Sequence, residues 1–78
     1  MKPKAPATGM PAALRAEAHA LLTAARDSGD PGGAAVDKLW LWLETQGLDG
    51  LCRIEIFFAE GDFGHDLDVI AGVINEAP

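Results

Sequence analysis

The segment LCRIEIFFA, residues 51–59, constrains the fold more than any other part of this sequence. Every second residue from Cys52 to Phe58 is apolar, whereas the opposite face mixes apolar residues with Arg53 and Glu55. Alternation of this kind, in a segment rich in Ile and Phe, is typical of a β-strand that buries one face. The pattern therefore predicts a strand at 51–59 and, with helices on either side of it, an α/β fold.

A single strand leaves its backbone N–H and C=O groups without partners, so residues 51–59 need a second strand beside them. Pairing with the same strand of a second copy, antiparallel across a two-fold axis, satisfies these groups and predicts a homodimer. Two alternatives remain open. The strand can pair with the edge of another protein, or residues 69–74 can return as the second strand of a C-terminal hairpin.

Two helices are predicted before the strand. Residues 11–28 begin with Pro11, which suits the first turn of a helix, and end at Ser28-Gly29. The segment DPGGAAVDKLWLWLETQG ends at Gly47 and carries an apolar stripe at helical spacing. Asp30 can serve as its N-cap, or the two following glycines can delay the start to about Ala34.

The last segment, HDLDVIAGVINEAP, fits either a helix or the returning strand. The helix is favoured because Leu67, Ile70 and Ile74 form one apolar stripe and Asp66 can cap its start. The predicted order is helix-helix-strand-helix. It forms a single small α/β domain at 9–78, after a tail at 1–8 that is rich in Pro and Lys and is predicted to be disordered.

Cysteine content and hydropathy indicate the cellular compartment in which the protein is expected. Cys52 is the single cysteine, which excludes an intrachain disulfide and a zinc site built from several thiolates. The N-terminus lacks the apolar stretch of a signal peptide, and no run approaches the roughly 18 apolar residues of a membrane span. These features predict a protein of the reducing cytoplasm.

Charge is distributed unevenly along the chain, whose net charge is −6. Residues 1–43 hold five basic and four acidic residues, whereas residues 44–78 hold eight acidic residues and one basic residue. The acidic second half repels nucleic acid and anionic lipid and attracts basic surfaces. Direct binding to nucleic acid or membrane is therefore not expected.

The stretch AEGDFGHDLD, residues 59–68, concentrates four carboxylates around His65 and Phe63. Neither acidic start of a calcium-binding loop fits, because Gly64 falls at position 5 counted from Glu60 and at position 3 counted from Asp62, whereas the loop needs its glycine at position 6. No thiol cluster accompanies His65, so no metal or other cofactor is predicted. Cys52 shares the apolar strand face and is expected to be inert. The prediction is a protein without enzymatic activity.

Recognition of a basic partner protein is the function that this stretch favours. Carboxylates spaced along a surface bind Lys and Arg through charge-assisted hydrogen bonds, and an aromatic ring among them is a common anchor. A protein that covers a basic nucleic-acid-binding site in this way needs no catalysis. The predicted contact residues are Glu55, Glu60, Asp62, Phe63, Asp66 and Asp68.

An apolar contact is the alternative. Trp42 lies off the apolar stripe of its helix, so it either packs within the chain or contacts a partner. A small adaptor or regulatory protein would bind through Trp42 and the strand edge at 51–59.

The sequence as a whole resembles the small phage-encoded anti-CRISPR proteins, and among them the inhibitors of type I-C systems. The resemblance rests on one small domain in which the acidic segment EIFFAEGDFGHDLD follows the amphipathic segment AAVDKLWLWLETQG. That class shares no signature motif, so it assigns no role to individual residues. The resemblance implies binding to a subunit of a CRISPR surveillance complex in the cytoplasm of a bacterial host cell, with the acidic residues in a basic groove that target DNA needs.

Overall fold

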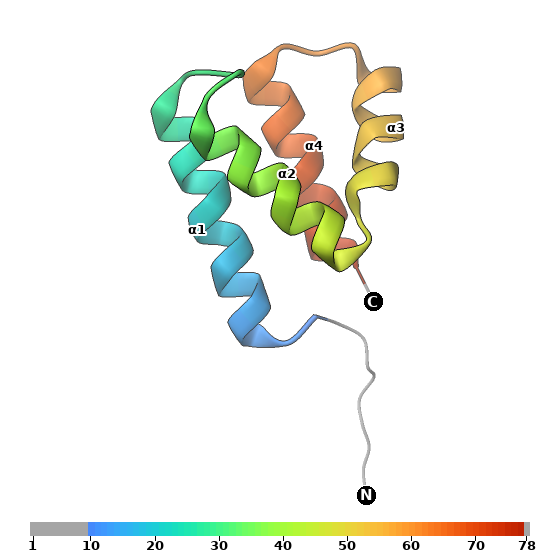
Figure 1. Ribbon diagram of the computed structural model, residues 1–78. Coiled ribbons are helices and arrows are strands. Elements are labelled where there is room, and N and C mark those ends of the chain that lie inside the picture. The colour runs from blue at the N-terminus through green and yellow to red at the C-terminus, as the bar shows by residue number, and fades with distance from the viewer. Residues whose placement is uncertain (1–9, 78) are drawn as a thin grey trace, which may run out of the picture.

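The computed structural model describes residues 10–77, and these residues form four helices (Figure 1). They are α1 (Ala12–Ser28), α2 (Ala34–Gln46), α3 (Asp49–Ala59) and α4 (Phe63–Glu76). The predicted tail at residues 1–8 lies outside the described part of the chain. The predicted α/β fold is wrong, because the described residues contain no strand.

The first two helices lie where the sequence predicts them. Helix α1 ends at Gly29, whose backbone is left-handed with φ of 62° and whose N–H donates to the carbonyl oxygen of Arg26. Helix α2 begins at Ala34 rather than after Asp30, because the carboxylate of Asp30 instead accepts from the N–H of Gly32 in a turn. Gly47, with φ of 75°, ends α2 as expected.

The predicted strand at 51–59 is a helix, α3, and this is the main correction to the sequence prediction. Seven of the nine residues in LCRIEIFFA are apolar, so the segment fits a period of two and a period of 3.6 about equally well. A helix forms its backbone hydrogen bonds within itself, which removes the need for a partner strand. The homodimer predicted through paired strands therefore loses its structural basis.

Helix α4 settles the ambiguity of the C-terminal segment in favour of the helix, so the alternative hairpin is also wrong. The helix begins at Phe63, earlier than predicted. Asp62, not Asp66, is its N-cap, and the Asp62 carboxylate accepts a 2.9 Å hydrogen bond from the backbone N–H of His65. The earlier start adds a turn in which Phe63 packs against the core.

One apolar core lies where α1, α2 and α4 meet, and α3 covers one side of it. Figure 1 shows α1 and α3 on opposite sides, with α2 and α4 between them. Leu39 and Leu43 of α2 and Leu67 and Ile70 of α4 are almost completely buried. Helix α3 contributes one fully buried residue, Cys52. Within residues 10–77, no helix has the length and apolar character needed to cross a bilayer.

Candidate functional site

The acidic residues predicted to contact a partner have different surroundings in the fold. Asp62 caps α4, and Asp68 forms a 3.1 Å ion pair with Arg26 of α1. Asp66 lies in the first turn of α4, where one carboxylate oxygen is buried without a hydrogen-bond partner among the described residues. Asp62 and Asp68 therefore already make an interaction within the chain, although both residues are exposed, and Asp66 is half-buried.

The other three predicted contact residues differ from one another in exposure. Glu60 is exposed and follows α3 with a left-handed backbone, φ 52°. Glu55 is exposed on α3, on the side that faces α4. Phe63 is half-buried and packs against the core, so it is not the free aromatic anchor that the sequence suggested. The six residues do not gather on one face, since Asp68 pairs with α1 and Glu55 lies between α3 and α4.

Cys52 is a buried structural thiol. Its side chain has no solvent exposure, and burial, assisted by the nearby Asp49 carboxylate, raises the pKa of the thiol from 9.0 to about 11. The thiol is therefore protonated at neutral pH and lacks the thiolate character of a nucleophile. Among residues 10–77, no three His, Cys, Asp or Glu side chains come together in a way that could hold a metal ion.

Trp42 belongs to the interior rather than to a contact surface. Only 8% of it is exposed, and its indole N–H donates a 2.8 Å hydrogen bond to the carboxylate of Glu17 on α1. The alternative reading, in which Trp42 is an exposed anchor, does not fit this placement. The neighbouring Trp40 is half-buried and has the guanidinium of Arg53 over its ring, 4.5 Å from the ring centroid.

An apolar surface lies on the outer side of α3. The strand prediction missed it because that prediction placed some of these side chains on a buried face. We call it the α3 face. It consists of four large side chains whose exposed fractions run from 50% to 76%: Leu51, Ile54, Phe57 and Phe58. The rings of Phe57 and Phe58 meet edge to face at a centroid distance of 5.4 Å. Apolar side chains at helical spacing opposite Cys52 and Ile56 are the sequence signal that could have revealed this face.

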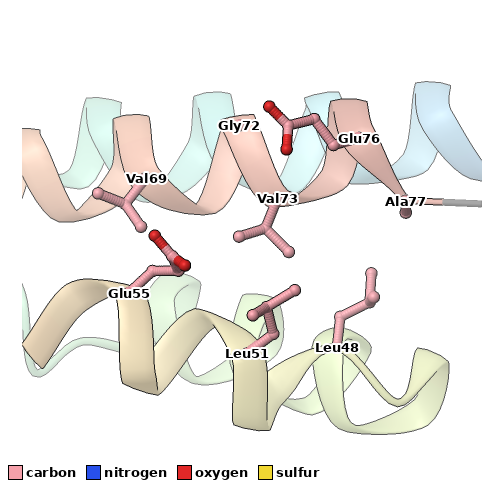
Figure 2. Close-up of a pocket in the computed structure, with 8 residues that line it drawn as sticks. All are labelled: Leu48, Leu51, Glu55, Val69, Gly72, Val73, Glu76 and Ala77. Atoms are coloured by element: carbon pink, nitrogen blue, oxygen red, sulfur yellow. The ribbon is translucent and has the colours of Figure 1, made fainter.

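A groove runs between α3 and α4 next to the α3 face. It forms an open cavity of about 370 Å³. Figure 2 shows Leu48 and Leu51 pointing toward α4, with Val73 opposite Leu51 and Val69 opposite Glu55. Glu55 of α3 and Glu76 of α4 also line the cavity. In Figure 2 the carboxylate of Glu55 lies between the two helices, whereas that of Glu76 lies over α4, away from α3. We call this the α3–α4 groove; it is lined by Leu48, Leu51, Glu55, Val69, Gly72, Val73, Glu76 and Ala77.

Leu51 belongs to both the α3 face and the α3–α4 groove, so the two features form one continuous apolar surface. Its chemistry suits contact with another molecule, because it combines apolar side chains with carboxylates at the edge. Comparisons with protein-family models, with curated proteins and with solved structures find no match for this chain.

Proposed function

We propose that this protein is a non-enzymatic binding protein that contacts a partner protein through the α3 face. The observation that carries the proposal is the outward direction of four large apolar side chains on a helix of 11 residues. Surface that is this apolar and this concentrated is unfavourable in water and marks interaction sites on small proteins. The aromatic pair Phe57 and Phe58 supplies the kind of side chain that dominates binding energy at interfaces.

The side chains of the α3 face do not form part of the buried core, in contrast to the buried side chains of α2. Replacing Phe57 or Phe58 leaves the buried core unchanged, since both side chains are about three-quarters exposed. Binding and folding therefore depend on different residues, which allows binding to be tested without unfolding the protein.

Site-specific photo-crosslinking in the native cells tests the proposal. A photoreactive phenylalanine analogue at position 57 should give a covalent adduct of one defined mass with another protein. The same analogue at position 41 is the matched control, because Leu41 is 64% exposed but lies on α2. Equal adducts from both positions, or none from position 57, would contradict a binding role of the α3 face.

A second candidate function rests on the charge of residues 44–78, which hold eight acidic residues and one basic residue. Under this proposal the chain covers a basic nucleic-acid-binding subunit of a CRISPR surveillance complex in the cytoplasm of a bacterial host. Glu55 and Glu60 are the carboxylates to test, because both are exposed and neither caps a helix N-terminus or pairs with Arg26. Reversing Asp62 instead would remove a helix cap and confuse binding with stability.

The measurement for this second candidate is target-DNA binding by a purified type I-C surveillance complex in the presence of the protein. Inhibition should weaken as salt rises, because exposed charge pairs are screened, and should be reduced in the double variant Glu55→Lys, Glu60→Lys. DNA binding that the wild-type protein leaves unchanged at low salt would remove this candidate.

A further inference from the structure

We propose that the α3–α4 groove binds a cationic amphipathic helix of the partner. One apolar side chain of the partner helix would enter the groove next to Gly72. Lys or Arg residues of the partner helix would lie beside Glu55 and Glu76. This inference rests on the proposed function of the α3 face and specifies the chemistry of the partner. Helix α3 is about 16 Å long at 1.5 Å per residue, so three to four turns of a partner helix would cover it.

Charge supplies the first argument. Glu55 and Glu76 line a cavity whose other side chains are apolar, and neither carboxylate forms an ion pair within residues 10–77. Placing an apolar partner over these carboxylates would desolvate them without compensation, which is costly. A partner with Lys or Arg at the edges of its apolar stripe would compensate the loss through charge-assisted hydrogen bonds.

Gly72 supplies the second argument. It lies inside α4, where glycine favours a helix less than alanine does. No neighbouring atom requires a glycine there, because a Cβ atom at this position would meet nothing within 4 Å. Gly72 is one of the residues that line the groove, so its missing side chain leaves the backbone of α4 open to close approach by a partner side chain.

A second copy of this chain fits the groove less well than a cationic helix. The helix that a second copy would present, α3, carries Asp49 and Glu55 and is followed by Glu60, against one basic residue, Arg53. The guanidinium of Arg53 already lies over the Trp40 ring. Contact between two copies would therefore bring carboxylates together around Glu55 and Glu76, and like charges placed side by side oppose association.

The test uses the full-length protein and a capped helical peptide of about four turns, with a stripe of Leu flanked by Lys. Two control peptides accompany it: one with the same composition in scrambled order, and one with Glu in place of Lys. Fluorescence anisotropy of the labelled peptides gives the affinities. We expect the Leu/Lys peptide to bind at least about tenfold more tightly than either control, a difference of about 1.4 kcal/mol.

Gly72→Leu is the decisive variant. The added side chain increases the bulk of the groove lining at this position, and it should weaken binding of the Leu/Lys peptide at least about tenfold. Leucine favours a helix more than glycine does, so the variant should fold at least as stably as the wild type, and its Tm checks this. The double variant Glu55→Gln, Glu76→Gln should also weaken binding and should flatten its salt dependence.

Three results would overturn the inference. These are the absence of binding by the Leu/Lys peptide, equal binding by its scrambled control, and unchanged affinity in Gly72→Leu. Sedimentation gives a further check, because a dimer that Gly72→Leu dissociates would identify a second copy as the occupant and so contradict the cationic partner. If crosslinks at position 57 persist while Gly72→Leu has no effect, the groove proposal fails and the binding role of the α3 face stands.

Discussion

Helices α2 and α3 are similar in apolar content, but most large apolar side chains of α2 face the core, whereas most of those in α3 face solvent. In α2 most of the large apolar residues turn inward, and Val36, Leu39, Trp42 and Leu43 are buried, while Leu41 is exposed. In α3 one residue, Cys52, is buried, while the two phenylalanines and Ile54 face outward. The apolar residues of α2 therefore stabilise the fold, whereas most of those in α3 contribute little to it, which is why we assign α3 to contact with another molecule.

The strongest test of this contrast is a core substitution in α2. Leu43 has no exposed surface, so Leu43→Ala should lower the free energy of unfolding by about 3 kcal/mol through lost burial and the cavity left behind. Leu41→Ala is the matched control on the same helix, and it should cost less than about 0.5 kcal/mol because Leu41 is largely exposed. Urea denaturation followed by tryptophan fluorescence measures both. Similar losses in the two variants would contradict the described orientation of α2.

The burial of Cys52, the one fully buried residue of α3, can be tested through the pH dependence of the free energy of unfolding. Its thiol pKa is raised in the folded state, so the folded protein holds this proton more tightly than the unfolded chain does. This contribution is complete below pH 9 and is lost as pH rises through 9 toward 11, at a cost on the order of 2 kcal/mol by pH 11.

The control for this prediction is Cys52→Ala, because alanine has no proton to lose. Its unfolding free energy should fall less than that of the wild type between pH 9 and pH 11, even though its stability at neutral pH is lower. Denaturant titrations at several pH values give the comparison. Parallel pH profiles for the two proteins would show that the thiol is accessible, and α3 would then pack less closely than described.

Trp42 tests whether the side of α2 toward α1 is structural. Trp42→Phe removes the hydrogen bond to Glu17 and should cost about 1 kcal/mol beyond the change in packing. A double-mutant cycle with Glu17→Ala separates the two contributions, because the hydrogen-bond part disappears when its acceptor is already absent. Additive losses in the cycle would mean that the bond contributes nothing in solution.

Local sequence signals predicted three of the four helices. Gly29 and Gly47 end α1 and α2 as their positions indicated, because a left-handed helix end favours glycine. The start of α4 was misplaced from Asp62 to Asp66. Both residues are aspartates that can cap a helix, and the packing of Phe63 against the core, which no local pattern reports, selects the earlier one.

The error at residues 51–59 has a different origin. A segment with apolar residues on nearly every side satisfies both periods, so the choice between strand and helix depends on what lies beside it. In this fold the neighbours of residues 51–59 are helices α2 and α4. Within residues 10–77 there is no strand with which the backbone of this segment could pair. The candidate site was missed for the same reason, since the strand assignment placed Ile54 and Phe58 on a buried face, whereas the helix turns both outward.

The smallest expected effect on stability is the most informative about α3. The double variant Phe57→Ser, Phe58→Ser should change the free energy of unfolding by less than about 0.5 kcal/mol, because both rings are mostly exposed. Serine and phenylalanine also have similar helix propensities, so the backbone of α3 is not penalised. A photoreactive residue at position 54 should crosslink to the partner in the otherwise wild-type chain, and this crosslink should disappear in the double variant. If the free energy of unfolding instead falls by about 2 kcal/mol or more, the loss is as large as that of a buried core side chain. The two rings would then stabilise the fold, which contradicts the assignment of the α3 face as a binding surface.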